Sequence, residues 1–113
     1  QLPNKLGAKR ELFKKYQHAF SKLKGVRLFS EPKSCLSNYW LQTLLFDENL
    51  AMNRDSVLEV SNTSGLMTRP AWVLISELEP YKWAPSGDLT TAESLSRRII
   101  NIPSSPNLSK YPL

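Results

Sequence analysis

The first 24 residues carry apolar side chains at helical spacing, and this feature sets most of what the chain can fold into. The apolar positions, seven, three, four and three residues apart, are Leu6, Phe13, Tyr16, Phe20 and Leu23. This spacing predicts an amphipathic helix over about Lys5–Lys24, capped by Asn4 and ended by a left-handed Gly25. Since such a helix must bury its apolar side, the fold needs at least a second layer for it to pack against.

The opposite side of this helix is basic. Through Arg27 there are eight Lys or Arg residues and one acidic residue, whereas the remainder has seven bases and nine acids. The net charge of +5 is therefore concentrated in the first helix and the turn after it. A basic helix face is either solvated surface or a surface that binds nucleic acid or an anionic membrane. Because Tyr16 and Phe20 lie on the apolar stripe and are not interleaved with the bases, nucleic-acid binding is the weaker interpretation.

The rest of the chain alternates strand and helix patterns. Runs rich in aromatic and aliphatic residues predict strands, and capping residues before and glycine after an apolar pattern predict helices. The expected strands are Val26–Phe29, Tyr39–Phe46, Leu66–Arg69 (stopped by Pro70) and Ile99–Ile102. One expected helix runs from Asn53 to Gly65 and buries Val57, Leu58 and Val60. Another runs from Thr90 to Arg98, and its Thr90 and Glu93 form a capping box.

This order predicts an α+β fold with two layers, in which helices pack on a small mixed or antiparallel sheet. The length of 113 residues corresponds to one domain, 1–113, with a loosely held tail over 106–113. The longest uncharged apolar run is too short to span a membrane, and no signal peptide is visible.

The sequence offers no self-sufficient active site. A single cysteine, Cys35, and a single histidine, His18, exclude a Cys-based zinc site and make a Cys–His nucleophile a poor interpretation. The acidic pairs at 47–48 and 77/79 are better explained as solvated carboxylates than as a general acid and base. The four glycines are scattered at element ends and form no phosphate-binding loop.

Three ordered stretches nevertheless match a known pattern: Ser37–Leu41 (SNYWL), Gly65–Trp72 (GLMTRPAW) and Ala92–Ser105 (AESLSRRIINIPSS). Together with the Lys9–Arg10 helix before a Gly–Val strand, they resemble the C-terminal small domain of the DegT/StrS-type sugar aminotransferases. The branch most similar to them aminates nucleotide-linked 4-keto-6-deoxy-hexoses in pathways to legionaminic-acid-like bacterial surface sugars.

The resemblance implies a fold-type-I, pyridoxal-phosphate-dependent parent enzyme, cytoplasmic and homodimeric, that takes part in surface polysaccharide synthesis. In this family the Schiff-base lysine and the cofactor lie on a large domain that precedes the small one, so this chain alone should be inactive. Its partners would be that large domain, a nucleotide-sugar and an amino donor, with no nucleic acid or membrane. The alternative is a stand-alone basic module that binds nucleic acid through its first helix, or a purely structural domain.

On this resemblance, four residues are candidates for substrate binding. Arg69 has a guanidinium suited to phosphate or carboxylate oxygens, or it is a structural partner of an acid such as Glu77. Trp72 either stacks on a sugar or base or belongs to the core. Asn38 either bonds a substrate hydroxyl or forms a turn. Ser104 is a candidate lining residue after the last strand, and no residue is expected to bind a metal.

Overall fold

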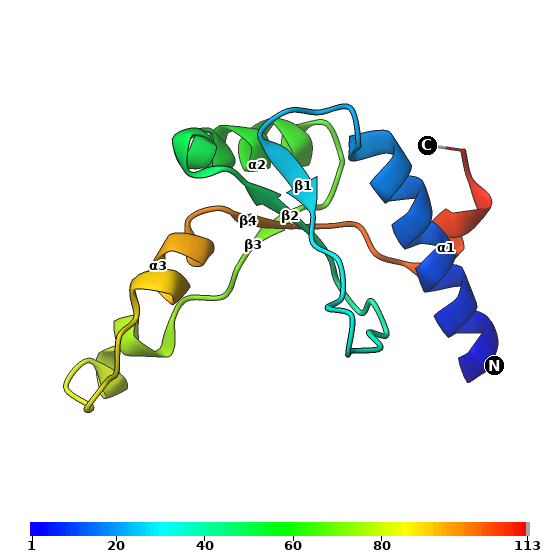
Figure 1. Ribbon diagram of the computed structural model, residues 1–113. Coiled ribbons are helices and arrows are strands. Elements are labelled where there is room, and N and C mark those ends of the chain that lie inside the picture. The colour runs from blue at the N-terminus through cyan, green and yellow to red at the C-terminus, as the bar shows by residue number, and fades with distance from the viewer. Residues whose placement is uncertain (113) are drawn as a thin grey trace.

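The structure is a computed structural model that describes residues 1–112. The fold consists of a four-stranded antiparallel sheet with two longer helices and a short one beside it (Figure 1), as the α+β prediction expects. The elements are α1 (Leu2–Phe20), β1 (Val26–Leu28), β2 (Gln42–Phe46), η1 (Glu48–Asn53), α2 (Arg54–Thr63), β3 (Arg69–Pro70), η2 (Ile75–Glu77), η3 (Glu79–Tyr81), α3 (Thr90–Ser96), β4 (Ile99–Ile102) and η4 (Pro106–Lys110), where η marks a 3-10 helix.

The strand order is β1-β2-β4-β3, and each neighbouring pair is antiparallel. β2 and β4 are therefore the two central strands, and Leu44 of β2 lies opposite Ile100 of β4. Both strands are apolar and mostly buried, as expected for the middle of a small sheet. β3 is an edge strand of two residues, in which Arg69 lies opposite Asn101.

The core lies on one face of the sheet, where α1 covers the two central strands. Leu12 and Tyr16 of α1 pack against alternate residues of the strands. The buried cluster consists of Leu12, Tyr16, Leu44, Phe46, Ile100 and Ile102. Leu58 of α2 and Leu108 of η4 pack against its margin. Burial of this face fixes the strand register, because a slip by one residue would move these side chains to the other face.

The first helix begins and ends earlier than its periodicity predicts. It runs over Leu2–Phe20, with Pro3 in its first turn, where a fixed φ favours a helix start. Ser21 follows the last helical residue, and its Oγ donates to the His18 carbonyl at 2.7 Å. Gly25 has the expected left-handed φ of +79°, but it turns the chain into β1 instead of ending the helix.

Two strand predictions are also too long or misplaced. β2 begins at Gln42 instead of Tyr39, because the backbone turns at Tyr39, whose φ is +47°. The Ser37 Oγ accepts from the Tyr39 N–H at 3.0 Å, which fixes that turn. Pro70 does not stop a strand over 66–69; it lies within β3, and an edge position tolerates a residue without an N–H.

The two shorter helices differ from prediction in their caps and their burial. In α2 only Leu58 packs on the core, while Val57 and Val60 are exposed. The cap of α3 is not a Thr90 capping box: an Asp88 oxygen accepts from the Thr90 N–H at 2.9 Å. α3 ends at Ser96 instead of Arg98, whose guanidinium donates to the Phe46 carbonyl at 2.8 Å.

The segment expected to be a loose tail packs against α1 over most of its length. The Nζ of Lys15 donates to the Ser109 carbonyl at 2.6 Å and to the Tyr111 carbonyl at 2.8 Å. Figure 1 shows η4 beside α1, with both chain ends at the same side of the molecule. Within residues 1–112 no helix is long and apolar enough to cross a membrane.

Candidate functional site

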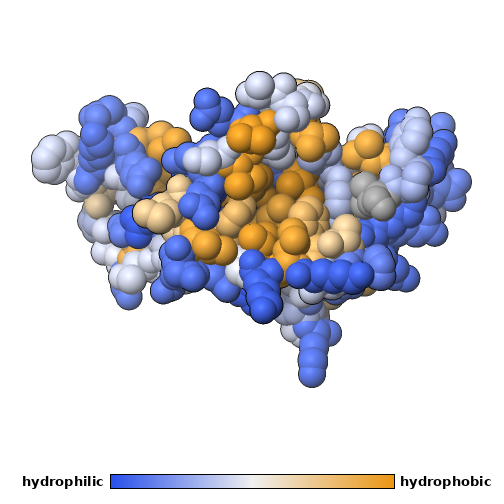
Figure 2. Space-filling view, turned by 90° about the horizontal axis from the view of Figure 1, so that it is seen from above, coloured by the Kyte–Doolittle hydropathy of each residue, from blue (hydrophilic) through white to orange (hydrophobic). Residues whose placement is uncertain are grey.

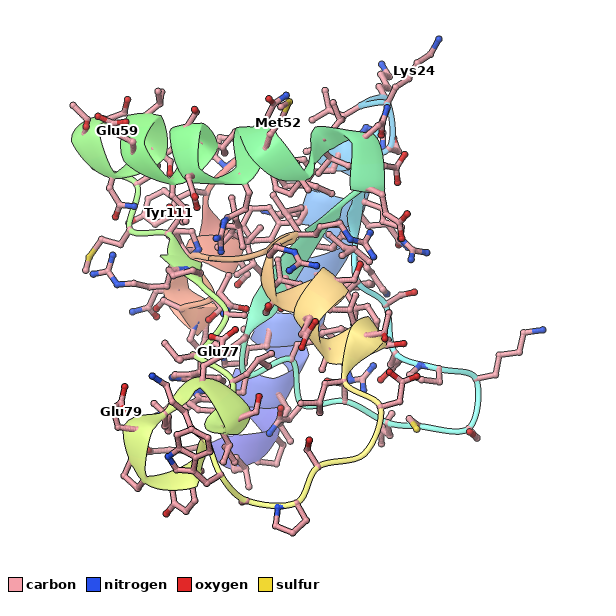
Figure 3. The ribbon with its side chains drawn as sticks, turned by 90° about the vertical axis from the view of Figure 1, so that its left-hand side faces the viewer. Lys24, Met52, Glu59, Glu77, Glu79 and Tyr111 are labelled. Atoms are coloured by element: carbon pink, nitrogen blue, oxygen red, sulfur yellow. The ribbon has the colours of Figure 1, made fainter. Side chains whose placement is uncertain are left out.

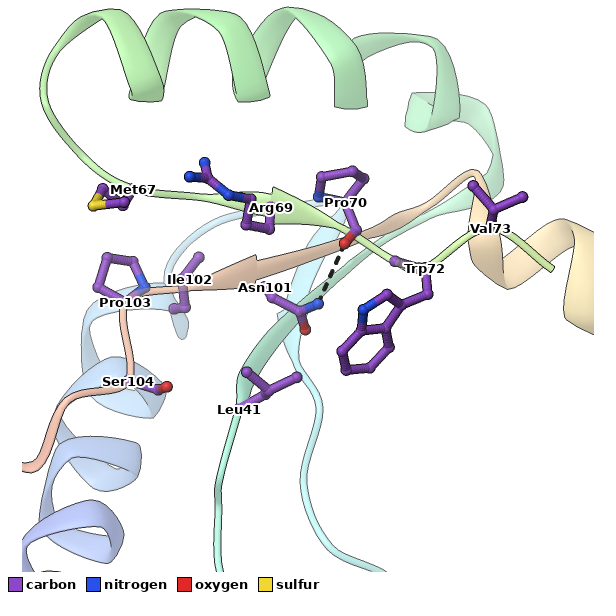
Figure 4. Close-up of a pocket in the computed structure, with 11 residues that line it drawn as sticks. Leu41, Met67, Arg69, Pro70, Trp72, Val73, Asn101, Ile102, Pro103 and Ser104 are labelled. Atoms are coloured by element: carbon purple, nitrogen blue, oxygen red, sulfur yellow. Dashed lines mark hydrogen bonds between the residues drawn. The ribbon is translucent and has the colours of Figure 1, made fainter. Parts of the chain in front are cut away.

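A groove of about 540 Å³ lies at the β3–β4 edge of the sheet (Figure 4). One wall comes from β3 and the chain that follows it, and the other from the end of β4. Its lining residues are Leu41, Met67, Arg69, Pro70, Ala71, Trp72, Val73, Asn101, Ile102, Pro103 and Ser104. The groove brings together three of the four candidate residues, Arg69, Trp72 and Ser104, and leaves out Asn38.

Sheet alternation explains which polar group faces this groove. Ile100 and Ile102 point into the core, so Asn101 between them points to the opposite face. The Asn101 side chain accepts from the Thr43 hydroxyl at 2.9 Å and donates to the Pro70 carbonyl at 3.4 Å. These contacts fix the Asn101 amide at the floor of the groove, and sequence reasoning did not select this residue.

Arg69 lies exposed at the rim. One guanidinium nitrogen donates to the Asn62 side-chain oxygen at 3.0 Å and to the Thr68 carbonyl at 2.9 Å. No carboxylate among residues 1–112 forms an ion pair with it, so the predicted structural pairing with Glu77 is wrong. Glu77 lies on the loop of η2, away from α2 (Figure 3). The guanidinium therefore keeps its charge uncompensated beside the groove, which suits an anionic ligand.

Trp72 is a surface residue, so its interpretation as a core residue is wrong. Its side chain is 71% exposed and lies against the groove (Figure 4). The indole of Trp40, itself 63% exposed, packs beside it, with ring centroids 6.1 Å apart and planes inclined by 30°. Two exposed indoles in contact offer flat apolar surface on which a base or sugar ring can stack.

Ser104 and Asn38 both take part in local structure. The Ser104 hydroxyl donates to the Trp40 carbonyl at 2.8 Å, which joins the chain after β4 to the turn before β2. The Asn38 side-chain oxygen accepts from the Trp40 N–H at 2.9 Å, the contact of an Asx turn. Asn38 thus forms the turn that sequence reasoning gave as its alternative role, and it does not line the groove.

Two basic residues of α1 support the turn that carries Trp40. The Nζ of Lys9 donates to the carbonyls of Tyr39, Trp40 and Ser104, at 3.3, 3.0 and 2.7 Å, and partial burial lowers the pKa of this amine. Arg10 lies over the Tyr39 ring, 5.3 Å from its centroid, and forms a two-bond pair with Glu31 at 3.0 and 3.2 Å. The Lys9–Arg10 dipeptide was noted in sequence as part of the resemblance, but no local signal indicates these long-range partners.

The same contacts weaken the nucleic-acid alternative. Lys9, Arg10 and Lys15 all bind groups within the chain instead of facing solvent freely. The basic side of α1 therefore offers fewer phosphate contacts than its composition suggests.

The described residues do not provide a pyridoxal phosphate site. The groove has no lysine in its lining, and Lys82 of the neighbouring loop is paired with Glu79. His18 and Cys35 lie exposed on α1 and on a loop, and no cluster of metal-ligating side chains occurs in residues 1–112. The groove lining contains no lysine, histidine or cysteine, and its polar side chains are those of Arg69, Asn101 and Ser104.

The structure is thus an α+β fold with a groove at one edge of its sheet. Comparison with protein families matches residues 1–112 to the DegT/DnrJ/EryC1/StrS aminotransferase family, and the chain belongs to that family. A search of curated proteins found no match.

Several solved structures share the fold. DesI, solved in the presence of its TDP-sugar product, is 27% identical, with a TM-score of 0.80 over 90% of this chain and 26% of its own. Helicobacter pylori PseC, an aminotransferase involved in pseudoaminic acid biosynthesis, is 17% identical, with a TM-score of 0.80 over 91% of this chain and 28% of its own. The aminotransferase TlmJ from Streptoalloteichus hindustanus is 21% identical, with a TM-score of 0.78 over 91% of this chain and 27% of its own. The chain therefore spans about a quarter of the length of these structures.

Proposed function

We propose that this chain is the C-terminal small domain of a pyridoxal-phosphate-dependent sugar aminotransferase and that its groove binds the nucleotide-sugar. Family membership and the fold shared with DesI and PseC support an aminotransferase parent. The assignment to the 4-keto-6-deoxy-hexose branch, to legionaminic-acid-like products and to the C-terminal position rests on the sequence resemblance. A homodimeric, cytoplasmic enzyme of surface polysaccharide synthesis follows from the same assignment.

The observation that carries the binding role is the groove rim. An exposed guanidinium that pairs with no carboxylate of residues 1–112 lies at the edge of an apolar, aromatic surface. A nucleotide-sugar offers the matching parts, since its diphosphate is anionic and its base and sugar rings are flat or apolar on their faces. Arg69 would bind the anionic part, Trp72 would stack on a ring, and the Asn101 amide would bond a polar substituent.

The cofactor would supply an electron sink and, with its lysine, the amine chemistry of the parent enzyme. Because the residues of this chain do not fit that group, their contribution is limited to binding, orienting and covering the sugar. A small domain of this kind raises the rate by holding the reacting carbon in place, which is worth several kcal/mol in favourable cases.

The test begins with the reading frame that encodes this chain. An upstream domain with a pyridoxal lysine, and amino transfer from glutamate to a nucleotide-linked 4-keto-6-deoxy-hexose by the full protein, would support the proposal. A full protein without such a domain, or one inactive on every nucleotide-linked keto-sugar, would contradict it. The second arm measures binding of the nucleotide-sugar by the same protein with Arg69→Met, using Arg27→Met on β1 as the matched control.

A further inference from the structure

Two exposed indoles face each other beside the groove, although they come from distant parts of the chain. Trp40 precedes β2 and Trp72 follows β3, and both remain more than half exposed. Little packing therefore holds either ring, so their contact at 6.1 Å needs support from the backbone. On the Trp40 side that backbone is unusual, because Tyr39 before it has a φ of +47°. A left-handed aromatic residue is strained and persists only where its surroundings enforce it.

Arg10 and Phe13 of α1 pack on the Tyr39 ring, and Lys9 holds the backbone of the same turn from outside it. Its Nζ donates at 3.0 Å to the Trp40 carbonyl and at 2.7 Å to the Ser104 carbonyl, and more weakly, at 3.3 Å, to Tyr39. An ammonium has three N–H donors and no acceptor, so this one amine uses all of them on three carbonyls. Trp40 precedes β2 and Ser104 follows β4, just beyond the Gln42–Ile102 pair of these two strands, and the lysine joins both backbones to each other and to α1.

We propose that Lys9 is a positioning residue that holds Trp40 against Trp72 and thereby sets the shape of the groove. Lys9 itself does not line the groove and would not touch the ligand. The ligand class, a nucleotide-sugar, rests on the proposed function. The three Lys9 contacts that hold the Trp40 turn, called the clamp below, rest on the structure alone. The ammonium provides charge-assisted bonds to two segments that share no strand pairing at this point.

The chain contains a matched control on the same helix. Lys15 also donates through Nζ to backbone carbonyls, at 2.6 Å to Ser109 and 2.8 Å to Tyr111, but these lie in η4 and beyond it. Lys9→Met and Lys15→Met therefore remove the same charge and the same kind of contact. Only Lys9→Met removes the contact from the backbone of Trp40 and Ser104, beside the groove.

The experiment follows the two indoles directly, in a Trp83→Phe background that leaves Trp40 and Trp72 as the only tryptophans. Two indoles at this separation produce a coupled pair of bands in far-ultraviolet circular dichroism. We expect Lys9→Met to lose most of this couplet and Lys15→Met to retain it, with similar melting temperatures for the two variants. A couplet that is absent in the parent, or equally strong in Lys9→Met, would overturn the proposal.

If Lys9→Met fails to fold, Ser104→Ala tests the same joint, because it removes the 2.8 Å bond to the Trp40 carbonyl without changing α1. Because Lys9 still donates to the Trp40 carbonyl in this variant, a couplet that is retained in Ser104→Ala and lost in Ser104→Ala/Lys9→Gln supports the clamp, and a couplet retained in both contradicts it. Titration of the protein with thymidine diphosphate and uridine diphosphate tests the proposed ligand class separately from the clamp. We expect affinity to fall roughly tenfold in Lys9→Met, the effect of about 1.4 kcal/mol, and not in Lys15→Met. If the parent binds neither nucleotide while the couplet behaves as expected, the clamp stands and the proposed ligand is wrong.

Discussion

At the scale of single residues, Arg69 is the side chain on which the binding role depends most. Its guanidinium is partly occupied by Asn62 and Thr68, which orient it and leave the rest of the group free at the groove rim. In the full-length enzyme, Arg69→Lys should weaken the half-reaction with the keto-sugar, because a point charge does not reproduce a planar two-bond contact. The expected loss is roughly 1.5–3 kcal/mol, or one to two decades in kcat/KM.

The half-reaction with the amino donor is the internal control for this variant. It should keep its rate, since Arg69 is proposed to contact only the sugar nucleotide. Arg27→Lys, at an exposed arginine on the far edge strand, controls for the general effect of replacing a guanidinium by an ammonium group. An unchanged keto-sugar half-reaction together with an earlier melting curve would mean that Arg69 only ties β3 to α2.

Glu31 makes the stability of the loop before β2 depend on pH. The pKa of its carboxyl lies below the ordinary 4.5, chiefly because the Arg10 guanidinium donates to it and also because the Ser37 N–H does. Its stabilising contribution is therefore complete above the unfolded-state pKa and is lost as the pH falls through the lower folded-state value. We expect Glu31→Gln to unfold at lower urea than the parent at neutral pH and the difference to shrink in acid. Urea midpoints measured across pH 2–7 check this, and parallel curves for the two proteins would contradict it.

At the scale of elements, the order of helices and strands was predictable, while their ends were not. The periodicity over residues 6–23 and the apolar runs of β2 and β4 carry enough local signal, because burial on one face imposes it directly. The ends depend on side-chain contacts that compete with periodicity. Ser21 ends α1 early, and the turn at Tyr39 takes three residues from the expected strand.

The groove was only partly predictable for the same reason. Arg69 and Ser104 were chosen as residues at strand ends, and the antiparallel pairing of β3 with β4 brings them to one edge. Trp40 was missed, since nothing local distinguishes an exposed tryptophan from a buried one. Asn101 was missed although its place between Ile100 and Ile102 indicates an outward-facing residue of the strand. The role of Lys9 could not be predicted from local sequence patterns, because its partners lie 30 to 95 residues away along the chain.

The turn into β1 gives an element-scale test with its own control. Gly25 and Gly65 have nearly the same left-handed φ, +79° and +82°. An added Cβ at Gly25 would clash with the Leu50 Cδ1, whereas at Gly65 no atom of residues 1–112 lies within 4 Å of it. Gly65→Ala should therefore cost only the backbone penalty of about 1–2 kcal/mol in unfolding free energy. Gly25→Ala should cost a further 1–3 kcal/mol, roughly, because Leu50 must move. Equal urea midpoints for the two variants would show that Leu50 yields freely.

At the scale of the whole molecule, the chain is more extended than an independent domain of its length. Its radius of gyration is 15.7 Å and its extents are 46 × 30 × 26 Å. A compact domain of this size would have a radius of gyration of roughly 13 Å. The excess comes from the segment between β3 and α3, which projects beyond the sheet (Figure 1). An apolar area also lies in the middle of the face seen from above (Figure 2), and Met52 on the α2 side points outward (Figure 3).

This architecture predicts that the chain alone does not retain pyridoxal phosphate. Lys82 is the lysine set among aromatic residues, yet it pairs with Glu79 and has no phosphate cradle beside it in sequence. After incubation with the cofactor and dialysis, we expect no aldimine absorbance band and no lysine labelled on borohydride reduction. Stable labelling of Lys82 that a Lys82→Arg variant abolishes would contradict this and place a cofactor site within the chain.

The projecting segment carries the largest run of exposed apolar side chains, namely Trp72, Val73, Ile75, Leu78, Tyr81 and Trp83. Apolar surface of this kind in a monomer marks a face that another protein surface covers. The chain spans only 26–28% of the length of the solved structures that share its fold. A surface that the rest of such a protein covers would therefore be exposed in the isolated chain. We therefore expect two copies of the isolated chain to associate through this segment. Sedimentation should show the mass rising from 12.9 kDa toward about twice that value with concentration.

The double variant Ile75→Lys/Trp83→Lys should hold the chain at monomer mass, because it places charges on side chains that are 69% and 93% exposed and so does not disturb the core. Met52→Lys is the matched control, since Met52 is 84% exposed but lies on η1, outside this segment. It should leave association unchanged. A parent that stays monomeric at all concentrations, or a Met52→Lys variant that dissociates as fully as the double variant, would show that the segment is not the contact surface.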